Sequence, residues 1–124
     1  MQFIIQGDVH DPLTATFQTI ELARLNEILK NSGVADPSIR RSICENYFFS
    51  AGKFIDSGWF ADQDRRFRPG TYFAEIGPHG KETGAVYLPD PAVGTMYHEY
   101  AHGAAAWLFD DHGEDSSEIE LGHA

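Results

Sequence analysis

The sequence predicts a single α+β domain in which two helices precede a small antiparallel sheet, and a third helix and a short terminal segment follow it. Three observations predict this order. Apolar residues recur at helical spacing up to residue 56, short Phe- and Tyr-rich runs separated by turn residues fill 59–88, and a helix-compatible stretch covers 95–109. The length of 124 residues fits one domain, 1–124, because domains typically take ~100–200 residues.

The first half of the chain contains a strand and two helices. Residues 2–6 contain enough β-branched side chains to predict a short strand. Asp11-Pro12 then predicts a break in regular secondary structure. Apolar spacing predicts an amphipathic helix over 19–32. Asp36 as N-cap and Pro37 at the first helical position predict a second helix over 37–56. Its apolar face would contain Ile39, Ile43, Tyr47, Ala51 and Phe54 or Ile55.

The segment 59–88 predicts the sheet, with 85–88 as its last strand and Gly84 as one of the turn residues before it. Four aromatic residues are expected to pack within this sheet: Trp59, Phe60, Tyr72 and Phe73. Three arginines are expected to lie on the solvent-exposed surface of a hairpin: Arg65, Arg66 and Arg68. After the helix at 95–109, a capping-box pattern at 117–120 predicts a short terminal helix.

Composition excludes several classes of protein. The formal charge of −10 disfavours direct binding to nucleic acid or to an anionic membrane, and no run approaches the ~18 apolar residues of a membrane helix. The single cysteine, Cys44, cannot form an intrachain disulfide, and its apolar neighbours predict a small core residue. The N-terminus lacks the basic start and apolar run of a signal peptide, so we expect a cytoplasmic protein.

The charge is concentrated in the last third of the chain. Residues 1–81 hold ten acidic and nine basic side chains, whereas residues 82–124 hold nine acidic and none basic. Four of the six histidines lie in that same third: His98, His102, His112 and His123. Imidazoles and carboxylates without competing cations suit a divalent metal ion.

The predicted third helix contains His98-Glu99-Tyr100-Ala101-His102, an H-E-x-x-H sequence. Positions i and i+4 stand one turn apart on the same face of a helix, so both imidazoles can converge on one metal ion with Glu99 beside it. Zinc lowers the pKa of a bound water towards ~7, and a nearby carboxylate can accept the proton and pass it to a leaving amine. Peptide hydrolysis is the reaction that this pattern predicts.

Residues 95–104, Thr-Met-Tyr-His-Glu-Tyr-Ala-His-Gly-Ala, resemble the extended motif of the zincin metallopeptidases. The order of the predicted elements is similar to that of small intracellular gluzincins, in which the sheet's last strand is an edge strand. This resemblance implies that His98 and His102 bind zinc, that Glu99 is the general base, and that a peptide or protein substrate could extend the sheet along 85–88.

In a gluzincin the third ligand is normally a glutamate on a later helix, and only 22 residues follow His102. The helix travels ~10 Å beyond His102 to its end, and an extended return needs ~3 residues and a helical return ~7 to regain that level. This places Glu120 or His123 near the site, with Glu75 on a strand as an upstream alternative. Three tyrosines are available as oxyanion stabilisers: Tyr72, Tyr87 and Tyr97.

Three other interpretations compete with the peptidase. The two histidines could be ordinary helix residues that hydrogen-bond to carbonyl groups or water. The metal could be purely structural, with four protein ligands and no open position. Finally, a small acidic protein can act as an inhibitor or immunity-type protein, presenting the carboxylates of 110–120 to a basic protein partner. An enzyme requires an accessible cleft at His98, Glu99 and His102, whereas an inhibitor requires exposed carboxylates.

Overall fold

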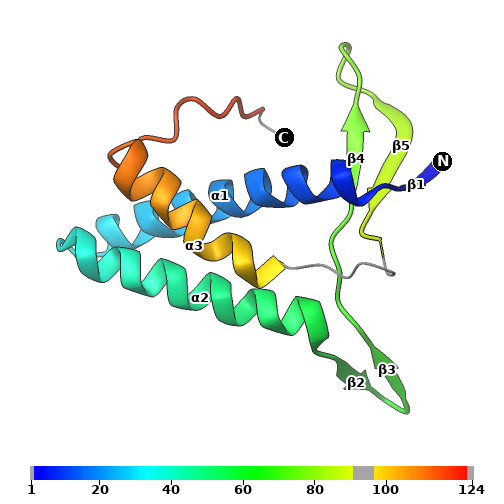
Figure 1. Ribbon diagram of the computed structural model, residues 1–124, viewed down its shortest axis with the longest axis horizontal. Helices are drawn as coiled ribbons and strands as arrows, with labels where there is room; N and C mark the ends of the chain where they lie inside the picture. Colours follow the sequence, from blue (N-terminus) through cyan, green and yellow to red (C-terminus); the bar gives the residue numbers. More distant parts are fainter. Residues whose placement is uncertain (1, 91–96, 123–124) are drawn as a thin grey trace.

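A computed structural model of the chain describes residues 2–90 and 97–122 and confirms the α+β prediction (Figure 1). The helices are α1 (Gly7–Asn31), α2 (Pro37–Ser57) and a third helical run. That run begins as the 3-10 turn η1 (Tyr97–Glu99), continues as α3 (Tyr100–Ala105) and ends as the π-helical η2 (Ala106–Asp111). The strands are β1 (Gln2–Ile5), β2 (Phe60–Asp62), β3 (Arg65–Phe67), β4 (Phe73–Ile76) and β5 (Glu82–Leu88).

The predicted break at Asp11-Pro12 is wrong, because α1 begins at Gly7 and runs through Pro12. Pro12 is the sixth residue of α1 and lies past its first turn, so it removes one backbone hydrogen bond from the helix interior, a loss that this 25-residue helix tolerates. The buried side chains of this first part are polar: the hydroxyl of Thr14 donates to the His10 carbonyl at 2.9 Å, and the Gln18 amide donates to the Tyr97 carbonyl at 2.9 Å. Apolar periodicity cannot detect such a stripe.

The prediction for α2 is confirmed to within one residue, and the Asp36 side chain caps it by accepting from the Ser38 N–H at 2.9 Å. The predicted buried face is wrong, however. The helix buries the positions one residue later, namely Arg40, Cys44, Phe48 and Gly52. One residue corresponds to about 100° around a helix, so Ile39, Ile43, Tyr47 and Phe54 lie instead on the outer side. Ala51 and Ile55, also expected on the apolar face, are half-buried.

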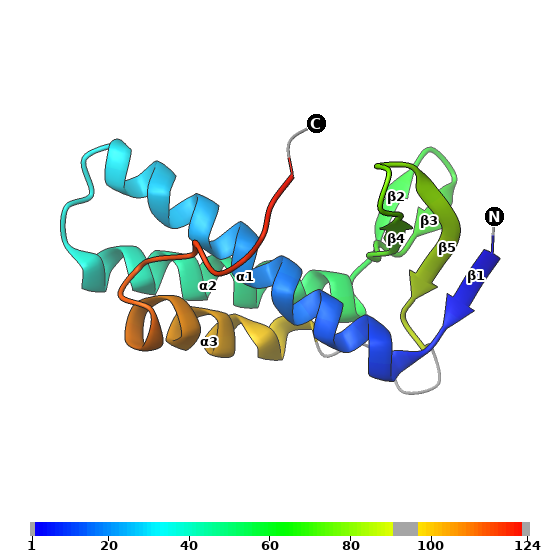
Figure 2. The same cartoon turned by 90° about the horizontal axis from the view of Figure 1, so that it is seen from above.

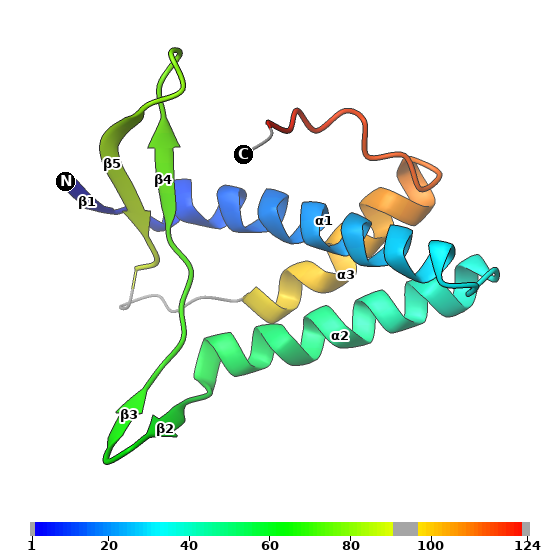
Figure 3. The same ribbon diagram turned by 180° about the vertical axis from the view of Figure 1, so that it is seen from behind.

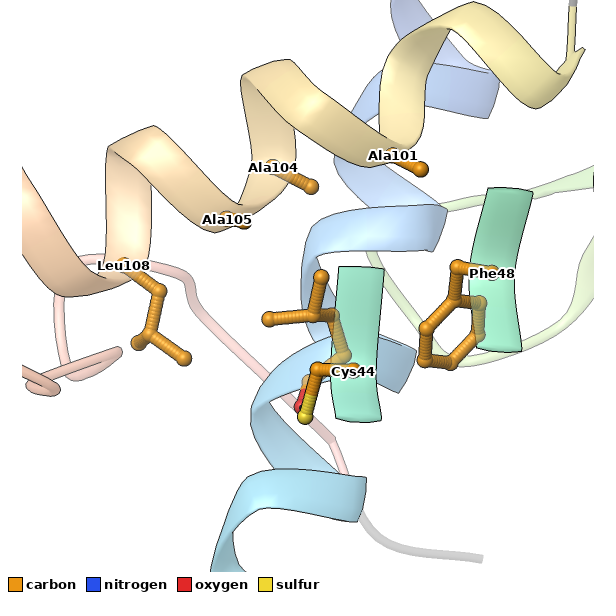
Figure 4. Packing of buried hydrophobic residues seen from close by; sticks show 7 residues of the cluster. Cys44, Phe48, Ala101, Ala104, Ala105 and Leu108 are labelled. Carbon is orange, nitrogen blue, oxygen red and sulfur yellow. The ribbon is translucent and has the colours of Figure 1, made fainter. Parts of the chain in front are cut away.

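Small side chains form the centre of the helical layer, where the third helical run lies across α1 and α2 (Figures 1 and 3). Ala101, Ala104 and Ala105 pack with Leu108, Leu22 and the thiol of Cys44 (Figure 4). Alanine permits close approach of helix backbones, which explains why a six-residue α-helix can pack across two long ones. The expectation that Cys44 is a small core residue is confirmed, since it is fully buried.

The expected helix over 95–109 is helical from Tyr97 to Asp111; its first two residues lie outside the described part of the chain. The short helix expected at 117–120 is wrong, because this segment forms turns without a helix. The Ser117 N–H is instead taken by the Asp115 carboxylate at 2.9 Å, and this local bond replaces the expected cap.

The main sheet has the order β1-β5-β4, which corrects two expectations. It is mixed, because β1 pairs with β5 in parallel, whereas β4 pairs with β5 in antiparallel fashion. In addition, β5 is the central strand and not an edge, so both its backbone edges are already paired at 85–88 and a substrate could not extend the sheet there. Gly84, expected in a turn, lies inside β5 with a φ of 91°.

Strands β2 and β3 form the predicted arginine-bearing hairpin, which projects beyond the end of α2 (Figure 1). The expected aromatic packing is wrong for Trp59 and Tyr72, which are exposed. Phe73 packs with its ring 5.8 Å from that of Phe17, and Phe60 packs across the hairpin with its ring 5.8 Å from that of Phe67. The three-residue strands of the hairpin are too short to bury aromatic side chains, and Trp59 is covered in part by Arg66, whose guanidinium lies 4.5 Å from its ring.

After Asp111 the chain turns and runs back along α1 (Figure 2). The turn is fastened to the helices by Glu114, whose carboxylate accepts from buried Arg40 at 2.7 Å and from Asn26 at 3.0 Å. Arg40 also donates to the carbonyls of Val34 and Ala35, so one guanidinium joins α2, the α1–α2 loop and the C-terminal turn. Within the described residues, no helix has both the length and the apolar character needed to cross a membrane.

Candidate metal centre

The H-E-x-x-H residues lie at the start of the third helical run, where η1 meets α3. Asp56, in the last turn of α2, fixes this start. Its carboxylate accepts the backbone N–H groups of Tyr97 at 2.9 Å and His98 at 3.0 Å. These are among the backbone donors that a helix leaves unpaired at its N-terminus, and a carboxylate there also complements the helix dipole.

The same carboxylate binds the imidazole of His98 through Nδ1. His98 is half-buried and Asp56 is nearly buried, so this pair is largely shielded from water. The ring of Phe49 meets the ring of His98 edge-on, with centroids 5.4 Å apart. Gly52 makes this approach possible, because a Cβ at that position would lie 2.5 Å from the His98 Cα. The contact between α2 and η1 therefore fixes both the backbone and the ring of His98.

His102 has a similar arrangement one turn later. Its Nδ1 lies 2.9 Å from the Glu45 carboxylate, and its ring is 5.4 Å from the Phe49 ring. Glu45 also accepts from Arg41 at 2.7 Å. Burial opposes ionisation of Glu45, but the hydrogen bonds from Arg41 and His102 outweigh it and lower the pKa of the carboxyl group. His102 is mostly exposed, so this second imidazole is more accessible than His98.

Both histidines thus use Nδ1 for a carboxylate on α2. Within the described part of the chain, Nε2 of neither ring takes part in a hydrogen bond. In metal proteins a ligating histidine typically donates its second ring N–H to a carboxylate or carbonyl, which fixes the tautomer that leaves the other nitrogen free for the metal. The surroundings of His98 and His102 have this character.

The other predicted site residues are placed less closely. Glu99 is exposed between the two histidines in sequence. Glu120 is exposed in the returning segment, next to Ile119, which lines a hollow with Thr19 and Tyr100 between α1 and α3. His123 lies outside the described residues. The described residues contain no group of three His, Cys, Asp or Glu side chains already arranged to hold a metal ion.

The remaining candidates are spread over the molecule. Glu75 is on strand β4, as expected, and is exposed. His112 stacks on Trp107 at 3.7 Å and contacts Glu118 at 3.0 Å, at the far end of the helical run. Of the tyrosines considered as oxyanion stabilisers, Tyr97 is buried, Tyr72 is exposed and Tyr87 is half-buried. Burial, followed by the charges of Glu21 and Asp56, raises the pKa of Tyr97.

A cavity of about 430 Å³ lies on the far side of Asp56, between the end of α2 and the sheet. Its lining is mostly apolar, with Ile5, Ile55 and Leu88, and includes the charged side chains of Asp56 and Arg68. Among the described residues, neither histidine nor Glu99 lines this cavity. Asp56 is therefore the residue that this cavity shares with the His98 site.

The residues that surround the two histidines were missed by reasoning from the sequence. Glu45, Phe49, Gly52 and Asp56 recur along α2 at intervals of four, three and four residues, which places them on one helical face. The signal that could have found them is the position of two acidic residues, Glu45 and Asp56, on one face of α2, since each could bind one of the two histidines of another helix. Comparison of the chain with protein-family models, with curated proteins and with solved structures finds no match.

Proposed function

We propose that this protein is a zinc-dependent peptidase in which Nε2 of His98 and Nε2 of His102 bind the metal and Glu99 is the general base. The observation that supports the proposal most strongly is the carboxylate bound to Nδ1 of each histidine, Asp56 for one and Glu45 for the other. An imidazole pair at i, i+4 is common on helices, but histidines that bind a metal typically have a carboxylate or carbonyl on the second ring nitrogen, as both of these histidines do.

The donor set fits zinc, which prefers imidazole nitrogen and carboxylate oxygen in a four-coordinate site. Zinc, when bound, supplies Lewis-acid activation of a water molecule near neutral pH. The protein's own residues would do the rest. Asp56 and Glu45 hold the two rings in one tautomer, and Phe49 packs against both rings and limits their rotation.

Glu99 suits the role of base because it is exposed, follows His98 in the sequence and directly precedes α3. It would accept a proton from the attacking water at a carboxylate oxygen and then deliver it to the nitrogen of the leaving amine. Glu120 or His123 would supply the third protein ligand. Ile119, the neighbour of Glu120, borders a hollow with Tyr100 and Trp107. This hollow lies on the side of the helical run opposite His98 and His102, so Glu120 would become a ligand only after the terminal segment moves around α3.

The acidic-inhibitor alternative has less support. Three carboxylates of the acidic segment are engaged within the chain: Asp110 with Arg41, Glu114 with Arg40, and Glu118 with His112. These internal pairs reduce the negative charge that could face a basic partner. A purely structural zinc site would require a fourth protein ligand in place of the open position.

The test is hydrolysis of a fluorescently labelled, unfolded protein substrate by the full chain, with zinc added in equimolar amount. We expect slow cleavage that is abolished by a chelator and restored by zinc. Glu99→Gln should lose at least 100-fold in rate while still binding zinc, because the amide cannot accept the proton. Glu27→Gln, an exposed glutamate of α1, is the matched control and should cleave at the wild-type rate.

Two outcomes would contradict the proposal. Zinc binding with no cleavage of any unfolded substrate would favour the structural site. Cleavage that is equal in wild type and Glu99→Gln would remove Glu99 from the reaction.

A further inference from the structure

Helix α2 carries a second apolar face that the fold does not bury. Ile39 is 51% exposed, Ile43 38%, Tyr47 59% and Phe54 45%. The intervals of four, four and seven residues place all four side chains on one stripe, about 23 Å long. The buried stripe of the same helix begins one residue later, at Arg40. Figures 1 and 3 show α2 at the rim of the helical layer, with α1 and α3 on one side of it.

This outer face is nearly uncharged, although the protein has a net charge of −10. The exposed residues between the apolar ones are Ser38, Ser42, Asn46, Ser50 and one cation, Lys53. Arg40 pairs with Glu114, and Arg41 pairs with Glu45 and Asp110, within the same chain. The ammonium of Lys53 lies 4.8 Å from the centre of the Phe49 ring. Depletion of charge around exposed aliphatic and aromatic side chains is typical of the centre of a protein interface.

We propose that this face binds the same face of a second copy of the chain, with the two α2 helices antiparallel about a twofold axis near Asn46 and Tyr47. The stripe is self-complementary in this arrangement. The midpoint of Ile39 and Phe54 lies between residues 46 and 47, where the axis is placed. Ile39 of one copy therefore meets Phe54 of the other copy, and the reverse. Ile43 then faces Ser50, a large residue against a small one. Two copies of a strongly acidic chain meet less local repulsion through a face with so few charges than through an acidic face.

The area fits a reversible dimer. The four side chains expose on the order of 400 Å² of apolar surface per chain, comparable with the largest patch on a typical monomer. Two copies and their polar margins would bury about 1,200 Å², the lower end for a specific interface. Buried area alone does not set the dissociation constant, so association has to be followed over a wide range of concentration.

Sedimentation equilibrium of the full chain, from about 1 μM to about 500 μM, tests the proposal. Wild type should pass from monomer to dimer in this range. Ile43→Glu and Ile39→Glu should each raise the dissociation constant at least 100-fold, with unchanged far-ultraviolet circular dichroism. Ile76→Glu adds the same charge at a 66% exposed isoleucine on β4 and should dimerise like wild type.

A short bis-maleimide crosslinker tests the geometry, since the native Cys44 is buried. Asn46→Cys should crosslink to its own copy, whereas Ser38→Cys, far from the axis, should not. A wild type that stays monomeric at 500 μM overturns the proposal, and binding of that monomer to phosphatidylcholine vesicles would assign the face to lipid. Dimers that crosslink at residue 38 and not at 46 overturn the antiparallel arrangement.

Discussion

The imidazole of His98 is bound through Nδ1 by Asp56, a residue 42 positions earlier in the chain, and the same carboxylate accepts the backbone N–H of His98 at 3.0 Å. One side chain therefore sets both the start of the third helical run and the tautomer of its first histidine. If His98 is a metal ligand, the affinity for the metal depends on a residue of α2 that would not itself contact it.

Asp56→Asn should weaken zinc binding about 10- to 100-fold. The amide nitrogen would donate to Nδ1 where the carboxylate accepts, which moves the ring proton to Nε2, the proposed ligand atom. Competition with a fluorescent zinc chelator measures the change. Asp64→Asn, at the exposed tip of the β2–β3 hairpin, is the control and should bind zinc like wild type. Equal affinities for both variants would show that Asp56 has only a structural role.

Gly52→Ala should destabilise the protein by about 1–3 kcal/mol. The added Cβ would lie 2.5 Å from the Cα and 2.7 Å from the backbone nitrogen of His98, so α2 and η1 would have to separate. Gly103→Ala is the matched control, because its Cβ would meet nothing within 4 Å, and helix propensity predicts a gain of about 0.5–1 kcal/mol. Urea denaturation of the two variants gives the free energies of unfolding. A stable Gly52→Ala would contradict the close packing.

Glu114→Gln should lower the free energy of unfolding at pH 7 by about 1–2 kcal/mol, because buried Arg40 loses its carboxylate partner while Glu114 itself is partly exposed. The hydrogen bond from Arg40 is the main reason that the pKa of Glu114 is below its ordinary value of 4.5. A carboxyl group with a lowered pKa stabilises the fold above its unfolded pKa, and this contribution is lost as the pH falls through the folded pKa. The difference between wild type and variant should therefore shrink steadily below about pH 4.5. A difference that does not change down to pH 2.5 would contradict this account.

Cys44 should react slowly with thiol reagents in the native protein. Burial is the main cause that raises the pKa of its thiol to about 11, and the side chain is fully enclosed between α1 and the third helical run. At pH 8 we expect labelling to accelerate at least about 100-fold in 6 M guanidinium chloride. Fast labelling of the native chain would show that the helical layer opens readily.

Much of the fold could be predicted from the sequence, because it depends on local signals. Asp36-Pro37 set the start of α2, and the turn residues near 62–64 and 77–80 divide the strands where the structure divides them. The errors arose where tertiary contacts decide. The hydrogen-bonded polar stripe of α1 is not apolar, and the apolar stripe of α2 faces outward. Neither the parallel pairing of β1 with β5 nor the central position of β5 is encoded locally.

The candidate site could be predicted only in part. Two histidines at i, i+4 are visible in any reading of the chain, but the carboxylates that hold them belong to another helix. Which face of α2 meets the third helical run is decided by Gly52, whose missing side chain permits the contact with His98. Neither Asp56 nor Glu45 has a sequence neighbour that indicates this role.

The most direct test of the central claim is the zinc content of untagged protein, measured by elemental analysis for wild type, His98→Ala and His102→Ala, with His79→Ala in an exposed turn as the control. We predict about one zinc per chain in wild type and in the control, and loss of the metal in both site variants. Absence of zinc from wild type, together with no rise in melting temperature when zinc is added, would contradict the proposed metal site and the peptidase activity that depends on it.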